Sequence, residues 1–174
     1  KFVTYNHNKI ADFQNLVASH RPALVAVTET WLDSDVLDSE ILPPCYTIHR
    51  KDRCETRPGK RGGGLLLAVD SSICSRRQAN LEPSCETMVC ELTGLHQRKT
   101  AVVLCYRPPD ANRTDFIQCF DTTLSRLSDT HELVVLGDFN MPQIDWHHPE
   151  QSRGLDGDFV PCALASHLEQ INSI

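Results

Sequence analysis

A carboxylate and an amide follow an apolar segment late in the chain. Residues 132–136 are mostly apolar and in part β-branched, the run stops at Gly137, and Asp138 and Asn140 come next. A short apolar run that ends at a glycine is typical of a fully buried strand. Beyond it, a carboxylate can bind a metal ion or accept a proton, and an amide can orient a phosphate or a water. On an extended backbone both would face one pocket; otherwise Asp138 and Asn140 are ordinary turn residues.

The same pattern occurs near the start of the chain. Residues 22–28 form another short apolar run, and Glu29 stands where it ends. Functional sites of layered α/β proteins usually lie at the edge of the sheet where central strands end. We therefore expect Glu29 and Asp138 to converge on one site, with Glu29 as a metal ligand.

Tyr106 and several basic residues extend this candidate site. Tyr106 ends the apolar run 100–105, and its hydroxyl could bind a phosphate oxygen or simply lie in water at an interface. The most cationic window of the chain contains Arg50, Lys51, Arg53, Arg57, Lys60 and Arg61. It suits contact with a nucleic-acid backbone, although a solvated loop is an equal alternative. Arg107 could add charge to the site or lie on the surface.

Helices and strands with clear periodicity must position these groups. Apolar positions predict a helix from Ile10 to His20, ended by Arg21-Pro22, and a second helix capped by Asn112 or Thr114. Helical spacing also covers residues 158–174, and residues 33–44 are acidic and loop-like. Strands are predicted at 45–50, 65–69, 85–92 and 100–106, the last two as an antiparallel pair.

Composition fits one intracellular domain. The chain has 174 residues, of which 40% are hydrophobic, so it can bury a core as a single domain, 1–174. A net charge of -6 gives no sign of a globally basic nucleic-acid binder. Eight cysteines occur without a CxxC pair, which favours reduced thiols over a disulfide framework or a zinc site. No signal peptide or membrane-spanning run is seen, so we expect no membrane association.

Four motifs in order resemble a known superfamily. They are Glu29-Thr30-Trp31, Gly62-Gly63-Gly64 before a strand, Tyr106-Arg107-Pro108-Pro109, and Gly137-Asp138-Phe139-Asn140 with Ile144-Asp145-Trp146 behind it. The chain is similar to the endonuclease/exonuclease/phosphatase superfamily, and most closely to the endonuclease domain of non-LTR (LINE-type) retrotransposon polyproteins. The resemblance implies a four-layer α/β (α+β) sandwich and assigns phosphate support to Tyr106.

The resemblance also implies what the chain lacks. The family's first-strand asparagine would lie at or before the start, since Asn8-Lys9 resembles the end of the family's Asn-Lys pair, and Asn6 is explained as a helix cap. The two last strands of the fold, with a Ser-Asp-His motif, do not follow, and His167 stands in a helical pattern. We expect a fold truncated at the C-terminus and at the N-terminus, with little or no activity.

The expected function is hydrolysis of a phosphodiester with Mg²⁺, or Mn²⁺ in its place. Glu29 would hold the ion, Asp138 would align or deprotonate the attacking water, Asn140 would hold the scissile group and Tyr106 would support the phosphate. DNA is the expected partner, in the nucleus, with a downstream reverse transcriptase in the same polyprotein. Two alternatives are a phosphatase of small phosphoesters on this fold and a non-catalytic DNA-binding remnant.

Overall fold

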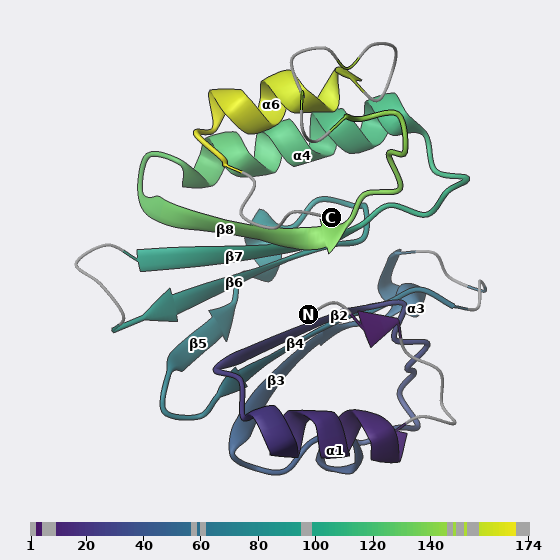
Figure 1. The fold of residues 1–174 in the computed structure, drawn as a ribbon, viewed down its shortest axis with the longest axis vertical. Coiled ribbons are helices and arrows are strands. Elements are labelled where there is room, and N and C mark those ends of the chain that lie inside the picture. The colour runs from purple at the N-terminus through teal and green to yellow at the C-terminus, as the bar shows by residue number, and fades with distance from the viewer. Residues whose placement is uncertain are drawn as a thin grey trace.

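Two β-sheets lie face to face, with helices on both outer faces (Figure 1). The computed structural model describes residues 3–4, 10–56, 59, 62–94, 99–145, 148, 152 and 157–169. One sheet has the order β1-β2-β4-β3, from β1 (Val3–Thr4), β2 (Leu24–Thr28), β3 (Tyr46–Lys51) and β4 (Leu65–Asp70). The other has the order β5-β6-β7-β8, from β5 (Cys74–Arg77), β6 (Thr87–Thr93), β7 (Lys99–Tyr106) and β8 (His131–Asp138). The helices are α1 (Ile10–His20), α2 (Asp38–Ile41), α3 (Arg53–Thr56), α4 (Arg113–Leu127) and α6 (Phe159–Ala165), with a 3-10 turn η2 (Ala79–Leu81).

Alternating side chains of the central strands build three apolar layers. In β7, Val103 and Cys105 face α4, whereas Val102 and Leu104 face the other sheet. Strand β4 alternates in the same way between α1 and the interior. Because both faces of these strands are buried, they read as continuous apolar runs. The predicted layered α/β architecture is confirmed.

Local signals place the two long helices correctly. Helix α1 ends at His20, directly before Arg21 and Pro22, as predicted. Helix α4 begins after Asn112, whose side chain accepts a hydrogen bond from the backbone N–H of Asp115 (3.3 Å). That bond satisfies one of the free N–H groups of the first turn. The antiparallel pairing predicted for the two strands before α4 is also confirmed, as β6 and β7.

Three expectations about the elements were wrong. Strand β8 is not fully buried: its exposure alternates and Val134 is 40% exposed. Among the described strands β8 pairs only with β7, so it forms an edge. The acidic segment contains the short helix α2, and the last helix spans seven residues of the range 158–174, part of which lies outside the described residues.

The topology brings three strand ends together. Strands β7 and β8 are parallel, and their last pair is Tyr106 with Asp138. Strand β2, which ends just before Glu29, lies against β7 and β8 of the opposite sheet.

Within the described part of the chain, no helix combines the length and apolar character that a membrane span requires.

Candidate active site

Glu29 leaves β2 in a strained turn that fixes its carboxylate. Its φ is 56° and that of Trp31 is 55°, both in the left-handed region. Its Oε2 accepts hydrogen bonds from Trp31 Nε1 (2.7 Å) and from the backbone N–H of Gly63 (3.2 Å). Strained backbone of this kind persists where the surrounding structure holds it, often at functional sites. The side chain of Glu29 remains 19% exposed, so a small cation can reach it.

The glycine run, Gly62 to Gly64, packs beside the Glu29 carboxylate. Gly62, Gly63 and Gly64 have φ values of 81°, 65° and 88°. A Cβ on Gly63 would lie 2.1 Å from the Arg53 guanidinium, and one on Gly64 would lie 2.5 Å from Thr30 Oγ1. Glycine is therefore required both by conformation and by space. The run precedes a strand as predicted, and its backbone also donates to Glu29.

Tyr106 links the early and late parts of the site. It ends β7 with its ring buried, and the guanidinium carbon of Arg53 lies 5.9 Å from the ring centroid. Burial raises the pKa of the Tyr106 hydroxyl, and the hydrogen bond and charge of Glu29 and the charge of Asp138 raise it further, whereas Arg53 lowers it. The phenol therefore stays protonated at neutral pH and can donate a hydrogen bond. The parallel ladder pairs Tyr106 with Asp138, and β2, which ends just before Glu29, lies against β7 and β8, so the structure brings Glu29, Tyr106 and Asp138 together.

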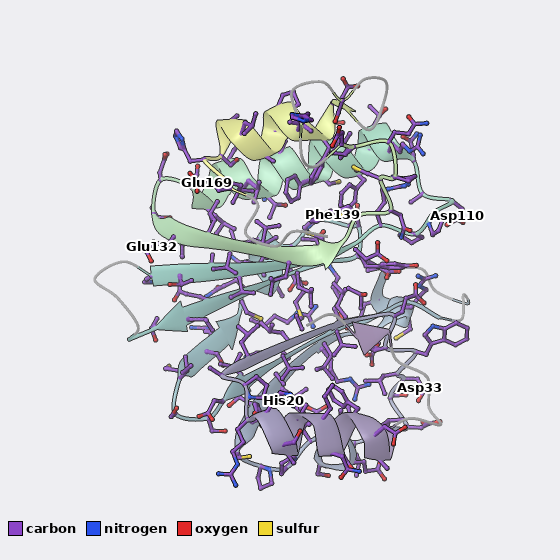
Figure 2. All side chains as sticks on the ribbon, viewed as in Figure 1. His20, Asp33, Asp110, Glu132, Phe139 and Glu169 are labelled. Carbon is purple, nitrogen blue, oxygen red and sulfur yellow. The ribbon has the colours of Figure 1, made fainter. Side chains whose placement is uncertain are left out.

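Asp138 and Asn140 flank a residue that anchors their loop. Phe139, labelled in Figure 2, points toward α4 and α6, where its ring centroid lies 6.0 Å from that of Phe120 and 4.9 Å from that of Phe159. Asp138 is exposed, and its Oδ1 accepts from the backbone N–H of Asn140 (3.1 Å). The backbone is not extended at Asn140, where φ is 47°. This turn, rather than an extended segment, sets the positions of the two side chains.

Arg107 is a buried brace, not a surface cation. It is 1% exposed, and its guanidinium donates to the carbonyl oxygens of Phe139 (2.8 Å), Ala111 (2.9 Å) and Asn140. Its own carbonyl accepts from Asn140 Nδ2 (2.9 Å). These bonds join the loop after β7 to the loop after β8. The predicted nucleic-acid contact does not fit this position, because the charge is enclosed by backbone.

Two other predicted nucleic-acid contacts also do not fit. Lys51 is 5% exposed, and its Nζ donates to the carbonyl oxygens of Pro83, Cys85 and Thr87 and lies 3.2 Å from Glu82. Arg50 is held by Asp52 (2.6 Å) and Asp38 (3.1 Å). Both side chains hold the fold together. Lys60 and Arg61 lie outside the described residues.

Glu86 and Arg53 form an ion pair that the sequence did not predict. Arg53 had been given another role, and Glu86 had been given none. Arg53 was expected to bind nucleic acid, but its Nε lies 2.7 Å from Glu86 Oε1 and its terminal nitrogen 3.9 Å from Glu29 Oε1. The buried Glu86 also accepts from the backbone N–H of Gly64 (3.2 Å). No sequence signal marks Glu86, because it precedes a strand rather than following one.

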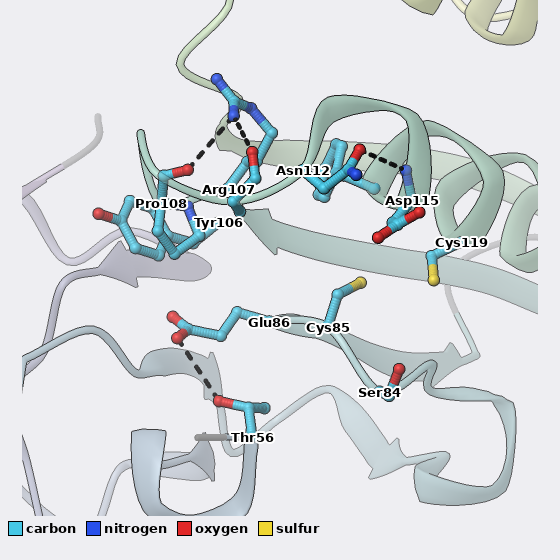
Figure 3. A pocket seen from close by; sticks show the side chains of 12 residues that line it. Thr56, Ser84, Cys85, Glu86, Tyr106, Arg107, Pro108, Asn112, Asp115 and Cys119 are labelled. Carbon is cyan, nitrogen blue, oxygen red and sulfur yellow. Dashed lines mark hydrogen bonds between the residues drawn. The ribbon is translucent and has the colours of Figure 1, made fainter. Parts of the chain in front are cut away.

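A cavity of about 220 Å³ is lined by Glu86 and Tyr106, among others. Figure 3 shows Glu86 and Cys85 on one side of it and Tyr106, Asn112 and Asp115 on the other. The cavity therefore lies beside Tyr106 at the end of β7.

The donor set fits a largely hydrated magnesium ion. Mg²⁺ in phosphate-handling sites is bound by one or two carboxylates plus waters and phosphate oxygens. Glu29 supplies one carboxylate, whose Oε2 is oriented by two donors while Oε1 meets Arg53 only at 3.9 Å. Among the described residues no group of three or more His, Cys, Asp or Glu side chains could hold a metal by itself. Glu29 thus fits as one carboxylate ligand of such an ion.

Two facing β-sheets with helices outside them (Figure 1), and carboxylates where strands end, define a layered α/β sandwich with a polar site at one edge. Residues 3–165 match the model of the Endonuclease/Exonuclease/phosphatase family, and the chain belongs to that family. The resemblance seen in the sequence is thereby confirmed at the level of the family. A search of curated proteins gave no match.

Solved structures support the same fold at low sequence identity. The endonuclease domain of TRAS1, a telomere-specific non-LTR retrotransposon, superposes with a TM-score of 0.71 at 13% identity, over 99% of this chain and 71% of that one. The 3′ phosphatase NExo from Neisseria, bound to a product DNA hairpin, gives 0.62 at 18% identity, over 95% and 69%. An AP endonuclease from Archaeoglobus fulgidus gives 0.62 at 14% identity, over 94% and 68%.

Proposed function

We propose that this chain is a magnesium-dependent phosphodiesterase domain that nicks DNA, of the kind found in non-LTR retrotransposons. The carrying observation is that β2, which ends just before Glu29, lies against β7 and β8, whose last ladder pair is Tyr106 and Asp138. The likeness to the TRAS1 domain and to two DNA-processing enzymes supports DNA as the substrate.

Each residue has a role that follows from its geometry. Glu29 holds the ion, Mg²⁺ or Mn²⁺, which would neutralise charge on the phosphate when bound. Exposed Asp138 accepts the proton of the attacking water. Tyr106, protonated at neutral pH, donates a hydrogen bond to a phosphate oxygen. Asn140 holds the scissile group from the loop that Arg107 braces. Lys60 and Arg61, which lie outside the described residues, are assigned to phosphate contacts from their charge alone.

A nicking assay on supercoiled plasmid tests the proposal. The chain is assayed with Mg²⁺, alone and within its native open reading frame. Glu29→Gln removes the charge that holds the ion and is expected to lower nicking about a hundredfold or more. Glu132→Gln is the matched control, because Glu132 is exposed at the opposite end of β8 (Figure 2).

The same assay separates the alternative functions. Release of phosphate from a 3′-phosphorylated oligonucleotide or a small ester, without nicking, would instead support a phosphatase. Salt-sensitive DNA binding without turnover in either form would support a DNA-binding remnant. Nicking that is equal in wild type and Glu29→Gln would contradict the assigned role of Glu29.

A further inference from the structure

An exposed aromatic ring lies beside the candidate active site. Trp31 is 53% exposed, and the other exposed large apolar residues described are Leu37, Val134 and Leu164. Trp31 differs from them because its indole Nε1 donates to Glu29 Oε2 (2.7 Å). The exposed ring is therefore one hydrogen bond away from the proposed metal ligand.

The indole is held in place on two sides. Its backbone N–H donates to the carbonyl of Gly63 (2.8 Å), and its ring lies over Gly62, where a Cβ would come within 3.1 Å of the indole Cζ2. Both contacts need the left-handed backbone of the glycine run. An aromatic side chain that is fixed yet exposed has already lost its rotamer freedom, so a partner that stacks on it pays little further entropy.

The chemistry of this surface suits a nucleotide. Aromatic rings bind bases by stacking, which tolerates any sequence because every base has a π-face. A nucleotide stacked there would present its phosphate next to Glu29.

We propose that Trp31 is a DNA-contacting residue whose exposed indole face stacks on a nucleotide beside the scissile phosphate, while its N–H positions the Glu29 carboxylate. This inference rests on the proposed function and deepens it. The two roles use different parts of one side chain, so separate substitutions can resolve them.

Stacking is tested by fluorescence and binding. In a Trp146→Phe background Trp31 is the single tryptophan, and DNA added without Mg²⁺ is expected to quench it, whereas heparin, a polyanion without bases, is not. Trp31→Ala is expected to weaken DNA binding about tenfold, in line with measured base–aromatic stacking. Leu164→Ala, which truncates another exposed apolar side chain, on α6, is expected to leave binding unchanged.

Positioning is tested with Trp31→Phe, which keeps an aromatic face and removes the N–H. DNA affinity is expected to stay within about twofold, because stacking remains. The Mg²⁺ concentration needed for half-maximal nicking is expected to rise roughly tenfold, the usual size of an effect on a residue that orients a metal ligand. A purely structural role would change stability without changing this Mg²⁺ requirement.

Failure of this inference is distinguishable from failure of the proposed function. If Glu29→Gln abolishes nicking but Trp31→Ala binds and nicks as wild type does, the function stands and the inference is overturned. If DNA quenches the fluorescence of Trp31 but neither the chain alone nor its longer form nicks plasmid, the stacking contact is supported and the nuclease proposal is overturned. Equal quenching by DNA and heparin would overturn the stacking contact.

Discussion

Gly63 is the residue on which the geometry of Glu29 depends most directly. Its N–H donates to Glu29 Oε2, its carbonyl accepts from the backbone of Trp31, and its missing side chain makes room for Arg53. A single position thus serves the carboxylate, the exposed indole and the guanidinium under which Tyr106 lies.

Gly63→Ala is expected to destabilise the protein by about 2 to 4 kcal/mol, because it combines an unfavourable φ with a displaced, paired guanidinium. Urea denaturation measures this loss. Gly94→Ala is the matched control, since Gly94 has a φ of 88° and no neighbour within 4 Å of a Cβ. Gly94→Ala should lower the free energy of unfolding only by the cost of a left-handed backbone at alanine, about 1 to 2 kcal/mol. Equal losses in the two variants would show that contact with Arg53 is unimportant.

At the scale of elements, the site depends on how the loops after β7 and β8 are joined. Tyr106 and Asp138 are paired by the parallel ladder, which needs a glycine at position 137, where a Cβ would lie 2.2 Å from the carbonyl oxygen of Cys105. Beyond the ladder, the guanidinium of Arg107 connects the two loops, because it donates hydrogen bonds to backbone carbonyls of both. A planar fork with five N–H donors suits this task.

Arg107→Lys is expected to lower nicking at least about tenfold. Three different guanidinium nitrogens bind the carbonyls of Phe139, Ala111 and Asn140, so a single ammonium cannot reproduce this spread and Asn140 loses its position. Plasmid nicking and circular dichroism are measured on the same samples. The far-ultraviolet spectrum should not change. The control is Arg126→Lys, at an exposed arginine of α4. Normal nicking by Arg107→Lys would mean that the brace does not set the site.

Across the whole molecule, polar contacts join the two sheets beside their shared apolar core. We call this set of contacts the polar seam; it consists of His49, Lys51, Ser75, Arg77 and Glu82. Lys51 of β3 reaches carbonyls at the start of β6, and His49 Nε2 lies 2.9 Å from Ser75 Oγ of β5. Arg77 of β5 binds Glu82 at 2.8 Å. Burial would raise the pKa of Glu82, but the hydrogen bond and charge of Arg77 and the charge of Lys51 lower it overall.

This seam predicts loss of stability in mild acid. Burial, and then the charge of Arg77, lower the pKa of His49 below its usual 6.5. The neutral imidazole is thus favoured by folding, and its contribution is present above pH 6.5 and lost as the pH falls toward the lowered pKa. The urea midpoint should therefore fall between pH 7 and pH 5, and His49→Gln should flatten this dependence. His20→Gln, at an exposed histidine at the end of α1, should not. If the urea midpoint of His49→Gln falls with pH as steeply as that of wild type, His49 is not the group responsible.

The lowered pKa of Glu82 adds a further loss of stability at more acidic pH.

Local patterns of residues were enough to locate the two long helices, most strands and the polar residues at the strand ends, but not the short helices α2 and α3. Amphipathic spacing and a capping residue act within a few positions, so α1 and α4 begin and end where local chemistry places them. Glu29, Tyr106 and Asp138 could be selected because each follows an apolar run, and that is also a local property.

Which charged groups a substrate can reach depends on contacts between distant segments, and these appear only in the folded chain. Arg50, Lys51 and Arg107 look like free cations in the sequence, yet each is bound by groups up to 36 residues away. Glu86 and the edge position of β8 were equally hidden. Burial of a long polar side chain, or of a strand face, depends on partners brought in from distant segments, and no local pattern of residues records which partners those will be.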